Sequence, residues 1–391
     1  MNTDKDINKY FIKLYVISLG LCFLTTFVLS PTTYPILGFL VGNGRFDDWW
    51  NTIPYVLKYP ENTEYICTIP WVFIAFIKVG GSYLGILSFY LLFICIGIYI
   101  LVKPYLILVS KYGRLYSFFI IFTYPILFSF WRGNSDFLIY GFVLASYIFW
   151  IEGKKNYSII MSGLGIMFKP YQIFYILIYK LKEIKARLPL IVFGFLSSLG
   201  LIYLGDNNFF TTSWRYLTQC GENYTKIYII GEAGSLHNNS IWGLFKFLLY
   251  TMEDSSEARA EIISNFSFYI KFWPVILVFT YILSRNKFII FNEDRENFSS
   301  HFFLISLLVA TLSPITPDYR LFLIGISLII LLLNQLKFRI ILPLILLILL
   351  PKEFLWVKID DVSFTINGPI NAMLMIFIYL YVMSKNIFLK K

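Results

Sequence analysis

Residues 157–180 read YSIIMSGLGIMFKPYQIFYILIYK, an apolar stretch as long as one membrane-spanning helix but interrupted by Lys169 and Pro170. Both flanks of this stretch are basic, with EGKKN before it and KLKEIKAR after it. A single crossing would place the two flanks on opposite sides of the membrane, so one basic flank would lie outside. This conflicts with the rule that cytoplasmic connections carry the excess of Lys and Arg. We therefore predict two short helices that meet outside at Lys169 and Pro170, because Pro170 has no backbone N–H for a continuous helix.

The remainder of the chain has the same apolar character. Of its 391 residues, 58% are hydrophobic and 14% are charged, which excludes an ordinary soluble enzyme. The sequence predicts an all-α polytopic membrane protein with about twelve transmembrane helices, organised as a single integral membrane domain over residues 1–391. The predicted spans are 11–30, 83–102, 115–130, 136–151, 157–168, 171–180, 188–204, 264–284, 299–312, 319–334, 339–351 and 370–384.

The distribution of basic residues predicts the orientation of these spans. With both termini in the cytoplasm, the short inner connections and the two ends hold 20 of the 33 Lys and Arg residues. We therefore expect a multi-pass protein of the cell membrane. The net charge of +10 does not indicate a nucleic-acid partner, because the basic residues form short clusters between apolar runs.

Three long outer loops, at about 31–82, 205–263 and 352–369, collect most of the polar residues. Cys67 and Cys220 lie in the first two loops, so a disulfide between them is one alternative. The acids Asp360 and Asp361 in the third loop are interpreted as solvated. These outer connections are the expected place of any active site.

The first outer loop contains the motif RFDDWWN at 45–51. One interpretation is an interfacial belt of tryptophans beside solvated acids. The other is a general base, Asp48 or Asp47, whose partial desolvation at the membrane surface suits proton transfer. The same pair could hold a divalent cation, but two carboxylates without further ligands make an incomplete site.

Further polar residues lie at three other predicted outer turns. The turn RGNSD at 132–136 places an Arg and an Asp beside the bilayer, where charged groups usually have a partner or a ligand. Lys169 is either a ligand-binding cation or a lysine that extends to the interface. The motif HNNS at 237–240 suits contacts with sugar hydroxyls or acid–base work, whereas a metal site there lacks a second His or Cys. The turn SPITPDYR at 313–320 adds Arg320.

One outer carboxylate and several cations suit glycosyl transfer from a lipid-phosphate sugar. The phosphate leaving group needs charge stabilisation rather than protonation, and the acceptor hydroxyl needs a base. A single displacement would invert the anomeric centre. Few charged residues lie at the predicted midplane, where ion-coupled transporters tend to keep them.

The ordered motifs resemble the GT-C superfamily of polyprenyl-phosphate-sugar-dependent glycosyltransferases, and within it glycosyltransferase family 87, a mannosyltransferase-like group formerly listed as a domain of unknown function. The resemblance covers most of the chain. It is carried by FDDWWNTIPY, RGNSDFLIYGFVLASYIFW, SGLGIMFKPYQIFYILIYK, HNNSIWGLF and SPITPDYRLFL. The sequence departs from the family after Ser313 and Pro314, where members often place a Trp and a His.

The resemblance implies a GT-C-like fold whose extracytoplasmic loops form the active site. It implies Asp48 as the base, with Asp47 as the alternative or as a holder of the acceptor hydroxyl. The donor would be a polyprenyl-phosphate hexose, most simply mannose, and the acceptor a glycan or glycolipid among the membrane lipids, without a cofactor. The phosphate would contact Arg132, Lys169 and Arg320, and the sugar or acceptor would contact Asn134, Tyr171, His237, Asn238 and Asn239.

Two other functions fit a polytopic protein with polar outer loops. A transporter or flippase for lipid-linked sugars or polysaccharide would show internal repeats and midplane polar residues, and neither is clear. A surface-polysaccharide polymerase would share the outer loops without requiring a lipid-monophosphate donor.

Overall fold

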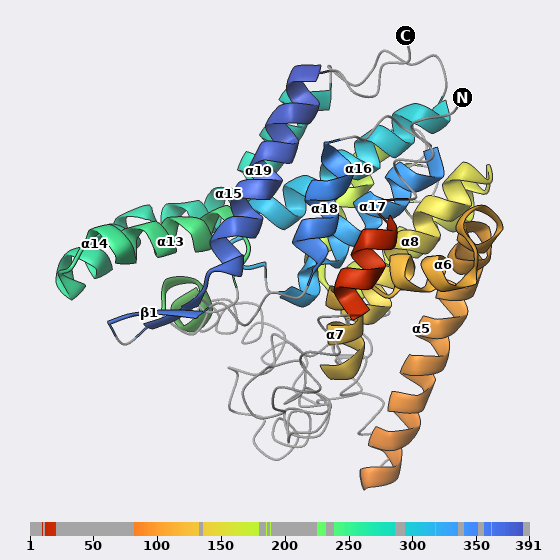
Figure 1. Cartoon of the computed structure of the whole chain (residues 1–391), viewed down its shortest axis with the longest axis horizontal. Helices are drawn as coiled ribbons and strands as arrows, with labels where there is room; N and C mark the ends of the chain where they lie inside the picture. Colours follow the sequence, from red (N-terminus) through yellow and green to blue (C-terminus); the bar gives the residue numbers. More distant parts are fainter. Residues whose placement is uncertain are drawn as a thin grey trace. The chain divides into compact units, whose positions relative to one another are not determined.

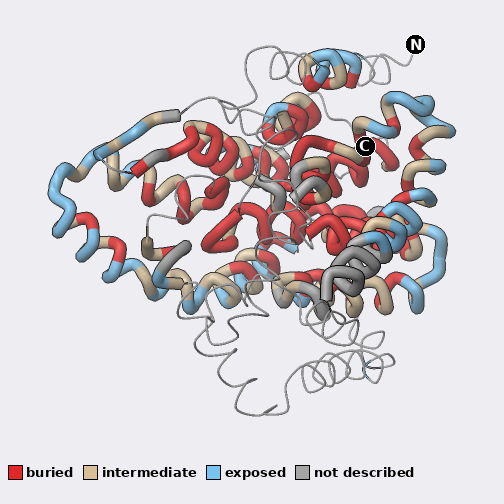
Figure 2. The backbone as a smooth tube through the Cα atoms, turned by 90° about the horizontal axis from the view of Figure 1, so that it is seen from below, coloured by how far each residue is buried: buried red, intermediate tan, exposed pale blue. Residues whose placement is uncertain are grey.

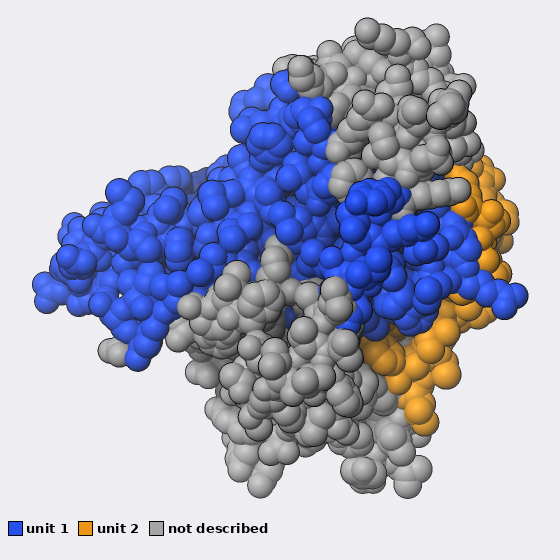
Figure 3. Space-filling model, viewed as in Figure 1, with its two compact units in different colours: residues 1–40, 112–128, 225–391 blue, residues 41–111, 129–224 orange. Residues whose placement is uncertain are grey.

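The computed structural model describes residues 10, 12–20, 82–132, 136–179, 185, 188, 225–231, 238–285, 294–316, 318–334, 340–350, 356–360 and 362–385, and this part of the chain is mostly helical (Figure 1). The chain divides into two compact units (Figure 3). The first unit comprises residues 1–40, 112–128 and 225–391, and the second comprises residues 41–111 and 129–224.

The second unit is built on α5 (Ser82–Tyr112, of which all but Tyr112 belongs to this unit), α8 (Asp136–Ile151), α9 (Lys155–Phe168) and the 3₁₀ helix η3 (Pro170–Ile178). Helix α8 packs against α9, and its close approach to α5 depends on two small residues. A Cβ atom on Gly97 would lie 2.2 Å from the Phe137 ring, and one on Gly141 would lie 3.2 Å from Ile100. Nearly all of α8 is therefore buried, as expected for a helix that is apolar on every face.

The predicted break at Lys169 and Pro170 is confirmed. Helix α9 ends at Phe168, Lys169 is extended with φ −146° and ψ 125°, and Pro170 begins η3. Proline suits the first position of a helix, where no N–H partner is needed. The returning segment differs from the expectation in being a 3₁₀ helix rather than an α-helix.

The predicted span 83–102 does not match the end of a helix. Helix α5 continues through Pro104 to Tyr112, and its portion Ile94–Tyr112 is long and apolar enough to cross a membrane. The apolar residues after Pro104 extend the helix, and Lys103 within it pairs with Glu152 at 2.5 Å. A single proline is tolerated in a long apolar helix when neighbouring groups satisfy the freed carbonyl.

The first unit contains α6 (Arg114–Ile121), the part of α7 (Tyr124–Arg132) up to Phe128, the π-helix η5 (Thr225–Ile230), α13 (Ile241–Met252), α14 (Ser256–Phe266), α15 (Phe268–Arg285), α16 (Asp294–Leu312), the 3₁₀ helix η7 (Asp318–Leu321), α17 (Phe322–Asn334), α18 (Ile341–Leu349), β1 (Trp356–Ile359), β2 (Val362–Thr365) and α19 (Asn367–Lys385). Helix α17 packs against α16, α18 and α6. Every residue from Phe322 to Leu333 is buried. Figure 2 shows the buried residues of the described helices in red. Helix α17 is therefore a central helix of this unit.

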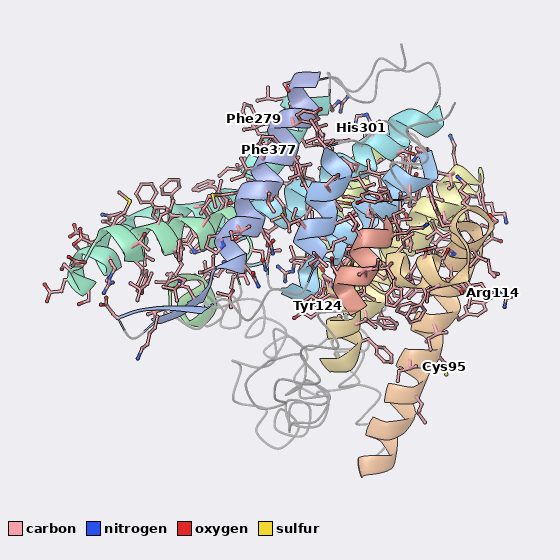
Figure 4. All side chains as sticks on the ribbon, viewed as in Figure 1. Cys95, Arg114, Tyr124, Phe279, His301 and Phe377 are labelled. Carbon is pink, nitrogen blue, oxygen red and sulfur yellow. The ribbon has the colours of Figure 1, made fainter. Side chains whose placement is uncertain are left out.

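Within the described residues, three helical segments are long and apolar enough to cross a membrane: Ile94–Tyr112, Phe268–Arg285 and Asn367–Ser384. The outer face of α15 exposes Phe272, Val275 and Phe279, and α19 exposes Phe377 (Figure 4). Neighbouring exposed apolar side chains of this kind are typical of surfaces that contact lipid or another protein. The structure is compatible with an α-helical membrane protein.

Two of the predicted outer loops contain regular structure. The interval 205–263 includes α13 and most of α14, and the interval 352–369 includes the hairpin of β1 and β2. The strands pair antiparallel with Ile359 opposite Val362. Asp360 has a φ of 53°, a left-handed conformation that Asp tolerates better than most residues.

The hairpin docks on α13 and α14. The Phe364 ring meets the rings of Phe247 and Tyr250, and Arg259 lies over Tyr250 with its Cζ atom 4.5 Å from the ring centroid. Asp360 was expected to be merely solvated, but one of its carboxylate oxygens lies 2.6 Å from Arg259 Nη1. The hairpin loop is thus tied to α14 by an ion pair.

Candidate functional site

Several predicted site residues lie outside the described residues, namely Asp47, Asp48, Asn134 and His237, together with the cysteines Cys67 and Cys220. Arg132 ends α7, and only its backbone is described. Their proposed roles stay predictions. The remaining predicted residues fall into two groups, one in each unit.

The first group, called the acid–lysine cluster, consists of Asp136, Lys169 and Tyr171 in the second unit. Asp136 begins α8, and its side chain is fully buried. Lys169 Nζ lies 2.5 Å from Asp136 Oδ2, and the Tyr171 hydroxyl donates to Oδ1 at 2.6 Å. An acid at a helix N-terminus is further stabilised by the partial positive charge of that end.

This geometry gives Lys169 a partner that sequence reasoning did not name. Lys169 was expected either to bind a donor phosphate or to extend into solvent, but its side chain is only 13% exposed and is paired with a carboxylate. A phosphate that contacts Lys169 must share the ammonium group with Asp136. The turn at 132–136 was predicted to have a partner or a ligand for its charges, and Asp136 has one.

The second group, called the asparagine cluster, consists of Asn238, Asn239, Thr316 and Asn371 in the first unit. Asn239 donates from its backbone N–H at 2.8 Å and from Nδ2 at 3.0 Å to the Thr316 carbonyl. Asn238 Oδ1 accepts from the Thr316 N–H at 2.9 Å, and Asn238 Nδ2 donates to the Pro314 carbonyl at 2.9 Å. Asn371 Nδ2 donates to Asn239 Oδ1 at 2.8 Å. All four residues are buried.

Arg320 stabilises the turn that the asparagine cluster contacts. Its Nη1 donates to Ser313 Oγ at 3.1 Å and also to the Ile315 carbonyl. Arg320 was expected to contact a lipid phosphate. In this structure its guanidinium holds the segment from Ser313 to Thr316, so it is at least a positioning residue for the asparagine cluster.

Two helix N-termini meet at the backbone carbonyl of Asn238. Ser240 caps α13 by accepting from the Gly243 N–H at 3.2 Å. A Cβ atom on Gly243 would lie 2.3 Å from Asn238 O, and one on Gly368, near the start of α19, would lie 2.5 Å from the same atom. Glycine at both positions is what allows α13 and α19 to approach the carbonyl.

This close approach makes Gly243→Ala a direct test of the junction. The new methyl group would overlap a backbone atom, so we expect the free energy of unfolding to fall by about 1–3 kcal/mol. Gly163→Ala is the matched control, because no atom lies within 4 Å of a Cβ at that helical position. Thermal unfolding of the purified protein in detergent measures both changes. Equal melting temperatures for Gly243→Ala and the wild type would contradict the described contact.

Helix α13 also anchors the chain before the asparagine cluster. Lys246, which is 1% exposed, donates from Nζ to the Gly231 carbonyl at 2.6 Å. Trp242 Nε1 donates to the Ile229 carbonyl at 2.9 Å. The described residues on both sides of 232–237, the segment that contains His237, are therefore held by the same helix.

Sequence reasoning missed Asn371 and Lys246 as members of this region. Asn371 lies in a predicted span, where a polar side chain usually has a partner, and that signal was available. Lys246 offered no comparable signal, because it lay in an interval interpreted as a loop. Compared with known proteins, the chain matches no family model, no curated protein and no solved structure.

Proposed function

We propose that this chain is an inverting glycosyltransferase of the cell membrane. It moves a hexose, with mannose as the first candidate, from a polyprenyl-phosphate donor to a glycan or glycolipid acceptor. The proposed enzyme crosses the membrane about twelve times, keeps both termini in the cytoplasm and works at the extracytoplasmic face.

The observation that supports this proposal best is the asparagine cluster. Its two motifs, HNNS and SPITPDYR, were singled out because their polar residues suit sugar and phosphate contacts, and Asn238 lies 76 residues from its partner Pro314. The described residues Asn238, Asn239 and Thr316 of these motifs form one buried, hydrogen-bonded cluster where α13 and α19 begin. Helix N-termini favour anions, such as the phosphate of a lipid-linked sugar.

The proposed reaction is a single displacement. The acceptor oxygen attacks the anomeric carbon, its proton passes to Asp48, and the bond from that carbon to the phosphate oxygen breaks. Polyprenyl phosphate leaves with the electron pair of the broken bond. The candidates for stabilising the phosphate charge are Arg132 and Lys169 in the second unit and Arg320 in the first, and Lys169 is held in place by Asp136 and Tyr171.

The test is sugar transfer by the purified protein in lipid nanodiscs, with a membrane-lipid extract as acceptor. Synthetic polyprenyl-phosphate mannose, glucose and galactose are compared, each with EDTA and with added divalent cation. We expect one donor to yield a labelled acceptor lipid or glycan. If a folded protein transfers none of them under either condition, the proposal is wrong, and a flippase or a polymerase becomes the better explanation.

A further inference from the structure

Asn367, the first residue of α19, has a buried polar atom that the fold does not use. Its side chain is enclosed, with 3% of the residue exposed. Within the part of the chain that the structure describes, its Oδ1 atom has no hydrogen-bond partner. A buried acceptor without a donor costs free energy, so its retention calls for an explanation.

The position of Asn367 suggests what the missing donor is. The next residue, Gly368, approaches the Asn238 carbonyl, and Gly243 of α13 approaches the same atom. Asn371, one helical turn further along α19, is already paired with Asn239. Asn367 therefore lies where the N-termini of α13 and α19 meet beside the asparagine cluster, and helix N-termini favour a neighbouring anion.

We propose that Asn367 Oδ1 accepts a hydrogen bond from a hydroxyl group of the donor's hexose. This inference rests on the proposed function and names a residue that recognises the sugar. An amide oxygen accepts hydrogen bonds, and the ionised phosphodiester of the donor offers none to accept. The sugar hydroxyls are the donors that such a ligand supplies, while its phosphate suits the helix N-termini.

The proposal separates stability from recognition. Asn367→Leu replaces the amide with an apolar group of similar size and removes the unpaired oxygen, so the melting temperature of the ligand-free protein should stay the same or rise. Asn371→Leu is the matched control on the same face of α19. It deprives Asn239 Oδ1 of a donor and should lower the melting temperature.

The experiment compares two probes by thermal shift: polyprenyl-phosphate mannose and polyprenyl phosphate without a sugar. The mannosyl lipid should stabilise the wild type more than the bare phosphate does. In Asn367→Leu this extra stabilisation should disappear, with about tenfold weaker binding of the mannosyl lipid, while stabilisation by the bare phosphate remains.

Asn367→Asp provides a second variant, because it keeps an oxygen acceptor in the same place. It should retain the extra stabilisation by mannose and lose part of the stabilisation by phosphate through charge repulsion. The inference is overturned if Asn367→Leu keeps the full sugar-dependent stabilisation, if it unfolds as early as Asn371→Leu, or if the wild type does not distinguish the probes. Sugar-dependent binding without transfer would instead refute the proposed reaction alone.

Discussion

Lys169→Met should lower the free energy of unfolding by about 3–5 kcal/mol, because it removes an ammonium group that stabilises the charge of a buried carboxylate. Asp136 has no exposed side-chain surface, and Lys169 Nζ lies 2.5 Å from it. The hydroxyl of Tyr171 would still donate to Asp136, but a neutral donor does not replace a positive charge. Thermal or denaturant unfolding in detergent measures the effect.

The double variant Asp136→Asn/Lys169→Met separates the ion pair from other effects of the substitution. Removing both charges should recover most of the lost stability. The attraction between two buried charges is largely offset by the cost of taking both out of water, so the pair adds little net stability to the fold. Lys154→Met is the control for an exposed pair, because Lys154 is 52% exposed and lies 3.4 Å from Glu152. That control should cost less than about 1 kcal/mol. A Lys169→Met protein as stable as the control would contradict the buried pair.

Asp48→Asn should reduce the turnover of sugar transfer by about 10²–10⁴-fold, the usual contribution of a general base. The amide keeps the size of the carboxylate but cannot take the proton of the acceptor hydroxyl. Donor binding should persist, because Asp48 is not among the residues proposed to contact the phosphate. Steady-state kinetics with the active polyprenyl-phosphate hexose would show a lower kcat with little change in the donor KM.

Asp47→Asn is the matched control for this assignment, since it changes the adjacent acid in the same motif. We expect a smaller loss of turnover than in Asp48→Asn. The reverse order would transfer the base role to Asp47, and full activity in both variants would refute a carboxylate base in this loop.

The break at Lys169 was predictable because two local signals agreed. Pro170 cannot continue a helix, and basic residues on both flanks conflict with a single crossing. The structure ends α9 at Phe168 and starts a new helix at Pro170. Sequence also indicated that the charges of the 132–136 turn would need a partner. It could not name Lys169, because that contact joins residues 33 positions apart through the packing of α8 on α9.

Helix α13 and the hairpin were missed for different reasons. The twelve residues of α13 are as many as in the predicted span 157–168, but Lys246 interrupts their apolar run, and the interval was therefore interpreted as a loop. The hairpin did have a signal in the sequence, since Val357 and Ile359 occupy alternate positions before Asp360, and Val362 and Phe364 occupy alternate positions after it. That signal was masked by the apparent role of this interval as a connection between spans. Asn367 could not be singled out from sequence, because an unsatisfied buried oxygen is visible only in three dimensions.

The hairpin, α13 and α19 are connected to one another at three places within the first unit. The first connection is covalent, since β2 leads through Ile366 directly into α19. The hairpin contacts α13 where Phe364 meets Phe247 and Tyr250, and α13 contacts α19 at the Asn238 carbonyl, between Gly243 and Gly368. Two helices that are only packed together can slide past each other, whereas three elements connected pairwise cannot do so without breaking a contact. A displacement of the hairpin would therefore move α13 and α19 at the Asn238 carbonyl as well.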